Sequence, residues 1–166
     1  HTGAGPGAAH LPLDTAGDAG EASFEIDAST RIGYMPPWPA GDGDVAFHGD
    51  RRLSRLEDGR FVPLAERFEG KRFNSPNDLV FGRDGSLYFT DPPYGLTRTF
   101  NDPGREIGWN GVYRLGVDGG LSVLVKDLKA PNGIGLSPDG RTLYVGQSDG
   151  ERPVVMAYDL TQDGRV

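Results

Sequence analysis

Two asparagines are the residues of this sequence whose type and spacing point most directly to chemistry. Asn77 lies in the run SPNDLVFGRDG and Asn132 in the run APNGIGLSPDG; both follow a proline and precede an apolar segment. A carboxamide oxygen suits a hard cation such as calcium or magnesium and is a poor ligand for a soft metal. Two neutral amides also add no negative charge, so a cation that they hold keeps its Lewis acidity. The alternative is that each asparagine only bonds its own backbone in a turn.

The two asparagines occupy equivalent places in an internal repeat. They lie 55 residues apart, and each copy continues into an aromatic segment, SLYFT in one and RTLYV in the other. Residues 56–61 match residues 115–121, and residues 160–164 begin this second unit again. A period of about 50–60 residues with about four strands is typical of a β-propeller blade. The register places both asparagines where an inner strand faces the propeller axis, which favours the cation site over the turn.

Short β-type segments separated by tight turns make up the sequence from residue 44 onwards. Segments of about 4–9 residues alternate with EDG, RDG, DGG, PDG and QDG. Asp-Gly pairs suit hairpin turns. The five Asp-Gly segments lack the further acidic residues that a calcium-binding EF-hand loop requires, so we interpret them as hairpin turns. We predict an all-β fold in which residues 44–166 form a partial β-propeller of roughly two to three blades. Because closed propellers have about 4–8 blades, further sequence or another chain is expected to complete it.

Residues 1–43 differ in composition from the rest. They are rich in Gly, Ala and Pro and show no period of either a strand or a helix. One short strand is expected at residues 24–26, before Pro36, Pro37 and Pro39 interrupt regular structure. We therefore interpret residues 1–43 as a largely irregular leader.

Composition excludes several classes of function. The 166 residues carry a formal net charge of −7 without a basic stripe, which argues against nucleic acid and anionic membranes as partners. The absence of cysteine excludes disulfides, thiolate nucleophiles and zinc fingers. No signal peptide is recognisable, which favours the cytoplasm, but the first residue is His1 rather than Met, so a periplasmic or secreted location stays open.

Longer motifs around the two asparagines resemble a known family. The run EGKRFNSPNDLVFGRDGSLYFTDPPYGL at 69–96, followed by GVYRL and by APNGIGLSPDGRTLYV at 130–145, is similar to the senescence-marker-protein-30, gluconolactonase and luciferin-regenerating-enzyme family. The HGDRR run at 48–52 resembles the gluconolactonase branch. The resemblance covers roughly residues 44–166. It implies a six-bladed propeller with one divalent cation in the central channel, where a lactone ring is opened. Calcium is the expected cation, with magnesium or zinc as alternatives.

The resemblance also implies roles for individual residues. Asn77 corresponds to the family asparagine that faces cation and substrate, and Asn132 to a direct cation ligand. The family completes its cation site with an early Glu and a later Asp. Neither Glu21 nor Glu25 has the context of that Glu, and the Asp-bearing segment has no counterpart within residues 1–166.

Other polar residues near these motifs are weaker candidates. Asp78 is next to Asn77 and is a candidate general base, although bonding to neighbouring backbone amides is an equally good reading. Tyr94 is a candidate substrate-binding residue at the channel mouth. Asp91 in the TDPPYG run and the lone His48 are more readily explained as structural residues, and Asp149 ranks below Asp78.

Three functions fit these observations. The first is metal-dependent hydrolysis of a small sugar lactone, in which the cation polarises the lactone carbonyl and water attacks it. A neutral lactone is compatible with the acidic chain. The second is a non-catalytic partial propeller that acts as a binding or assembly module through its exposed edge strands. The third is phosphotriester hydrolysis on the same scaffold.

Overall fold

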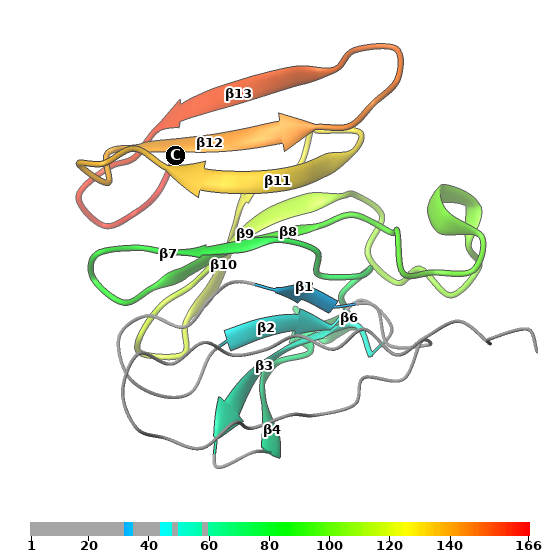
Figure 1. The fold of residues 1–166 in the computed structure, drawn as a ribbon. Helices are drawn as coiled ribbons and strands as arrows, with labels where there is room; N and C mark the ends of the chain where they lie inside the picture. The colour runs from blue at the N-terminus through cyan, green and yellow to red at the C-terminus, as the bar shows by residue number, and fades with distance from the viewer. Residues whose placement is uncertain (1–31, 35–43, 48–49, 58–59) are drawn as a thin grey trace, which may run out of the picture.

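A computed structural model describes residues 32–34, 44–47, 50–57 and 60–166, and these residues form antiparallel β-sheets that follow the chain order. Figure 1 shows the three larger sheets one above another, from the first sheet to the third. The first contains β1 (Ile32–Tyr34), β2 (Asp44–Phe47), β3 (Arg52–Glu57) and β4 (Arg60–Ala65). The second contains β7 (Leu79–Phe81), β8 (Leu87–Asp91), β9 (Gly111–Leu115) and β10 (Leu121–Val125). The third contains β11 (Pro131–Leu136), β12 (Thr142–Gln147) and β13 (Val154–Asp159).

Two smaller elements complete the described structure. The ribbon of β5 (Arg67–Phe68) and β6 (Lys71–Arg72) lies between the first and second sheets in the chain, and a 3₁₀ turn covers Thr99–Asn101. Among the described residues, no helix has the length and apolar character needed to span a bilayer.

The arrangement of the sheets is that of propeller blades. Each is a meander of neighbouring strands, and β11, the first strand of the third sheet, contacts β7 and β8 of the second. The first strands of the second and third blades, β7 and β11, therefore lie next to one another (Figure 1). The predicted all-β fold and partial propeller are confirmed, with three sheets within the predicted range.

The junction between blades explains the apolar character of β8. All five of its residues are buried, because the two faces of the strand pack into different cores. Phe89 packs with Phe73 and Tyr113 toward the first sheet, with ring centroids 5.2–5.5 Å apart. Tyr88 packs toward the third sheet, in a core that includes Leu143 and Val145. A strand buried on both faces carries a continuous apolar run instead of an alternating one.

The third sheet has one open face. Side chains of β13 alternate between half-buried and exposed: Met156 and Tyr158 pack on the core, whereas Val155 is 71% exposed. Tyr144, on β12, is 42% exposed. The outer face of this sheet therefore presents apolar surface to solvent.

The predicted Asp-Gly turns are confirmed where the structure describes them. Gly85, Gly119, Gly140 and Gly164 all have φ between 73° and 83°, a region that glycine occupies without strain. In the turns of Asp84, Asp118 and Asp139, the carboxylate accepts the backbone N–H two residues later. These acids therefore close hairpins. The fifth predicted turn, at Asp58, lies outside the described residues.

The leader is only partly covered by the described structure. The strand expected at residues 24–26, and also His48, lie outside the described residues. β1 falls inside the range assigned to the leader and pairs with β2 in antiparallel register, with Gly33 opposite Ala46. The boundary at residue 44 stays a prediction.

Candidate functional site

The two repeat-related asparagines contact one another. Asn77 lies just before β7 and Asn132 is the second residue of β11; the Asn77 Nδ2 donates a hydrogen bond to the Asn132 Oδ1. Both residues are half-buried. The 55-residue repeat thus appears in space as a direct contact across the junction of two blades.

Thr90, at the end of β8, holds the backbones of both asparagines in place. Its carbonyl accepts the N–H of Asn77 at 2.9 Å, and its own N–H donates to the carbonyl of Asp78 at 3.0 Å. Its Oγ1 donates to the carbonyl of Asn132 at 2.7 Å. One threonine therefore fixes the spacing between the two carboxamides.

The Asp78 carboxylate also spans the junction between blades. One oxygen accepts the N–H of Leu79 at 2.9 Å, and the other accepts the N–H of Ile134 in β11 at 3.0 Å. The backbone-bonding reading of Asp78 is therefore realised, and it reaches into the next blade. Its role as a general base stays a prediction.

Tyr94 and Ser148 extend the site on the Asn132 side. The Asn132 Nδ2 donates to the Ser148 Oγ at 2.9 Å, and the backbone N–H of Ser148 donates to the Ala130 carbonyl at 2.9 Å. The Tyr94 hydroxyl donates to the same carbonyl at 3.5 Å, the outer limit of a hydrogen bond. Burial raises the pKa of Tyr94, and a hydrogen bond with Ser148 opposes this shift. Tyr94 is therefore protonated at neutral pH.

The reasoning from sequence did not identify Ser148. The repeat could have pointed to it. Ser148 follows the aromatic strand of the second repeat copy, and the corresponding strand of the first copy is followed by the DPPYG run that carries Tyr94. The structure brings these two residues, which follow corresponding strands, to one carbonyl, that of Ala130.

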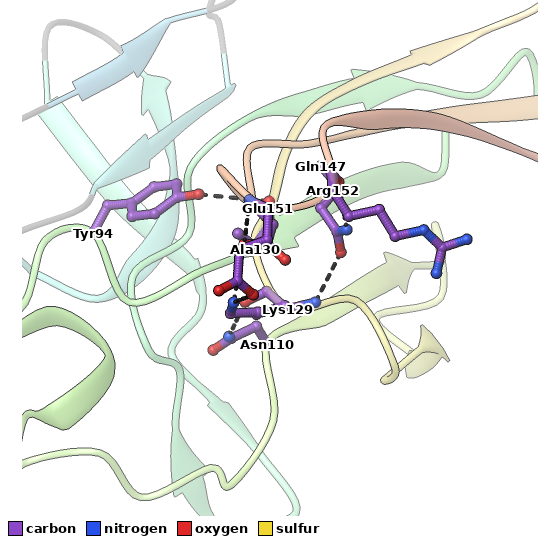
Figure 2. Close-up of polar contacts among 8 residues, drawn as sticks. Tyr94, Asn110, Lys129, Ala130, Gln147, Glu151 and Arg152 are labelled. Carbon is purple, nitrogen blue, oxygen red and sulfur yellow. Dashed lines mark hydrogen bonds and ion pairs between the residues drawn. The ribbon is translucent and has the colours of Figure 1, made fainter.

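A network of polar contacts anchors the loop that follows Ser148 (Figure 2). The Lys129 ammonium forms ion pairs with Asp149 at 3.0 Å and with Glu151 at 3.1 Å. The Lys129 N–H donates to the Gln147 side chain, whose amide in turn donates to the Arg152 carbonyl. Asp149, a minor candidate from sequence, is thus paired with a lysine, and the three charged groups together leave one net negative charge beside the site.

Asp91 supports the site from inside the protein. It is fully buried, and its two carboxylate oxygens accept the N–H groups of Asn74 and Ser75 at 2.8 and 2.7 Å. Burial raises the pKa of Asp91 to about 7, and the two backbone hydrogen bonds oppose the shift. Asp91 therefore fixes the segment that leads to Asn77, in agreement with its structural interpretation from sequence.

The donor atoms present fit part of a site for a hard cation. Asn77 and Asn132 supply two neutral carboxamide oxygens, the ligand type that calcium and magnesium accept. In the contact seen here one amide donates to the other; a half-turn of the Asn77 amide would exchange its donor for its acceptor. No cluster of three or more His, Cys, Asp or Glu side chains suited to a metal occurs in the part of the chain that the structure describes. A complete site would need further ligands.

Antiparallel meanders of three or four strands, stacked as blades, define a β-propeller, and polar side chains gather where β7 and β11, the first strands of two blades, meet. The chain belongs to the SMP-30/Gluconolactonase/LRE-like family, whose model matches residues 12–166. The match begins within the segment interpreted from sequence as a leader.

Individual relatives point in the same direction. Over 133 residues the chain is 48% identical to a gluconolactonase of Zymomonas mobilis, a match that covers 78% of this chain and 37% of the relative. A solved gluconolactonase of Xanthomonas campestris is 38% identical, with a TM-score of 0.61 over 70% of this chain and 40% of that one. A luciferin-regenerating enzyme with a TM-score of 0.54 is 17% identical and shares the fold; the match covers 87% of this chain and 46% of that one. The chain thus spans less than half the length of these relatives.

Proposed function

We propose that the protein containing this chain hydrolyses a small sugar lactone. Two of the relatives described above carry the name gluconolactonase. The observation that carries the proposal is the contact between Asn77 and Asn132, which brings two carboxamides from equivalent positions of neighbouring blades to one point.

Asn77 and Asn132 are the proposed ligands of one divalent cation, for which calcium is the first choice; hard amide oxygens suit calcium or magnesium better than zinc. When bound, such a cation supplies Lewis acidity to the carbonyl of the substrate. Thr90 and Asp78 keep the two asparagines at a fixed spacing through their hydrogen bonds to both blades. This preorganisation lowers the cost of assembling the site around a substrate.

The remaining side chains have proposed roles in binding and proton transfer. Asn77 orients the lactone, and Tyr94 lines the mouth of the site with its protonated hydroxyl; the ring of Phe100 packs edge-on against the Tyr94 ring. Asp78 is the candidate acceptor for the proton of the attacking water, since each carboxylate oxygen keeps a lone pair after accepting one N–H.

Local charge favours a neutral substrate over an anionic one. The Lys129, Asp149 and Glu151 side chains carry one net negative charge next to Ser148, and the whole chain has a net charge of −7. The net charge of the chain does not favour long-range attraction of an anionic lactone, whereas a neutral lactone is compatible with it.

A turnover assay of the full-length protein tests the proposal. We expect hydrolysis of gluconolactone in calcium, loss of the rate in chelator and recovery on adding calcium back. Asn132→Ala should remove the activity, and Asn101→Ala, an exposed asparagine on the 3₁₀ turn, should keep it. Faster calcium-dependent turnover of a phosphotriester than of the lactone would replace the proposal with the alternative chemistry.

A second proposal is an assembly role for the chain itself. The outer face of the third sheet exposes Tyr144 and Val155, and β13 is an edge strand of that sheet. We propose that further blades, or another chain, cover this face and complete the propeller, because an exposed apolar face and a free strand edge both favour association.

A further inference from the structure

Ser148 extends the chain of hydrogen bonds that begins at the asparagine pair. The Asn77 amide donates to Asn132, and Asn132 donates to the Ser148 Oγ at 2.9 Å. The N–H of Ser148 and the hydroxyl of Tyr94 both donate to the Ala130 carbonyl, at 2.9 and 3.5 Å. Figure 2 shows the Tyr94 hydroxyl directed toward Ala130, just before the start of β11.

The Ala130 carbonyl orients the groups around it. A carbonyl oxygen only accepts, so the single proton of the Tyr94 hydroxyl is used on Ala130. The backbone bond of Ser148 to this carbonyl places its side chain beside Asn132, whose Nδ2 donates to the Ser148 oxygen. Asn132 presents its Nδ2 to Ser148 and its Oδ1 to Asn77.

We infer that Ser148 is a positioning residue that orients the Asn132 carboxamide, so that its oxygen, and not its nitrogen, faces the proposed cation. The inference rests on the proposed function, because it assumes that Asn132 is a ligand. It adds a residue to the site and gives the two asparagines different roles: Asn132 is held in one orientation by Ser148, whereas Asn77 donates to Asn132. Loss of a hydrogen bond that orients a metal-ligating side chain typically lowers the affinity for the metal.

Calcium titration calorimetry of the full-length protein tests this inference with a readout other than activity. We expect Ser148→Ala to lower calcium affinity by about 10-fold, because the Asn132 amide loses the acceptor that orients it. Ser148→Thr keeps the hydroxyl and should restore most of the affinity; the side chain is exposed, so the added methyl has room. Ser122→Ala, on strand β10 of the second sheet, is the matched control and should bind calcium like the unaltered protein.

Melting temperatures in chelator separate orientation from folding. Ser148→Ala and Ser122→Ala should melt close to the unaltered protein, since neither removes a buried apolar side chain. Calcium affinity of Ser148→Ala equal to that of the unaltered protein would overturn the role of Ser148 alone. An unaltered protein that hydrolyses lactone without binding calcium would overturn this inference and the proposed cation together. An unaltered protein that binds calcium but leaves the lactone intact would refute the proposed reaction, while the affinities of the Ser148 variants would still decide the role of Ser148.

Discussion

The carboxylate of Asp78 accepts the backbone N–H of Ile134 at 3.0 Å, so a side chain in one blade satisfies an edge group of the next. Ile134 belongs to β11, the edge strand of the third sheet, where backbone N–H groups lack a neighbouring strand. The same carboxylate accepts the N–H of Leu79 in its own blade. Asp78 therefore couples the position of Asn77 to that of Asn132.

Replacing Asp78 should destabilise the protein. In Asp78→Asn only one side-chain atom can still accept, so one backbone N–H loses its partner, and we expect the free energy of unfolding to fall by about 1–3 kcal/mol. Denaturant unfolding of the full-length protein measures this. Unchanged stability would contradict the coupling of the two blades through Asp78.

The same variant addresses proton transfer. If Asp78 also accepts the proton of the attacking water, kcat of the folded Asp78→Asn protein should fall by about 100-fold or more, with little change in KM. A loss of kcat below about 10-fold would limit Asp78 to its structural role.

Asn132 should respond to charge in the manner of a cation ligand. Asn132→Asp keeps an oxygen donor and adds a negative charge, so calcium affinity should be kept or raised, whereas Asn132→Ala should lower it. Titration calorimetry compares the two variants, with Asn101→Ala as the control. Equal affinities of the Asp and Ala variants would show that Asn132 does not contact the cation.

Stability should depend on pH through Asp91. Burial raises the pKa of this carboxyl from 3.8 to about 7, so between these pH values the folded protein binds more protons than the unfolded chain. The free energy of unfolding must therefore fall as pH rises through that range and level off above it. Asp91→Asn carries no titrating proton, and the difference in melting temperature between the unaltered protein and this variant should shrink from pH 5 to pH 8. A difference that is constant over this range would contradict the raised pKa.

Residues 44–166 expressed alone should self-associate. Val155 is 71% exposed and Tyr144 is 42% exposed on the open face of the third sheet, and burial of such surface stabilises contacts by about 25 cal/mol per Å². We expect the apparent mass from light scattering to rise with protein concentration. The double variant Val155→Lys and Tyr144→Lys should lower that association, and Val117→Lys, an exposed turn valine in the second sheet, is the control. A monomer independent of concentration would contradict the prediction.

The all-β fold and the pairing of the two asparagines could be predicted from the sequence because both depend on local and repeated patterns. Short apolar segments and Asp-Gly pairs define strands and hairpins within a few residues of one another, as the turns at Gly85 and Gly140 show. A repeat places equivalent residues in equivalent positions, and adjacent blades then bring Asn77 and Asn132 together.

Only the tertiary structure decided which other side chains join them. The long-range partners of Asp78, Asp91 and Ser148 lie 16–56 residues away in the sequence, and no local pattern encodes which atoms meet over such separations. The burial of both faces of β8, which gives Asp91 its raised pKa at the end of that strand, likewise requires sheets on either side. The sequence therefore determined the strands of the blades and the positions of the two asparagines in the repeat. Packing between blades decided how the two carboxamides are oriented, because long-range hydrogen bonds form only after the sheets have stacked.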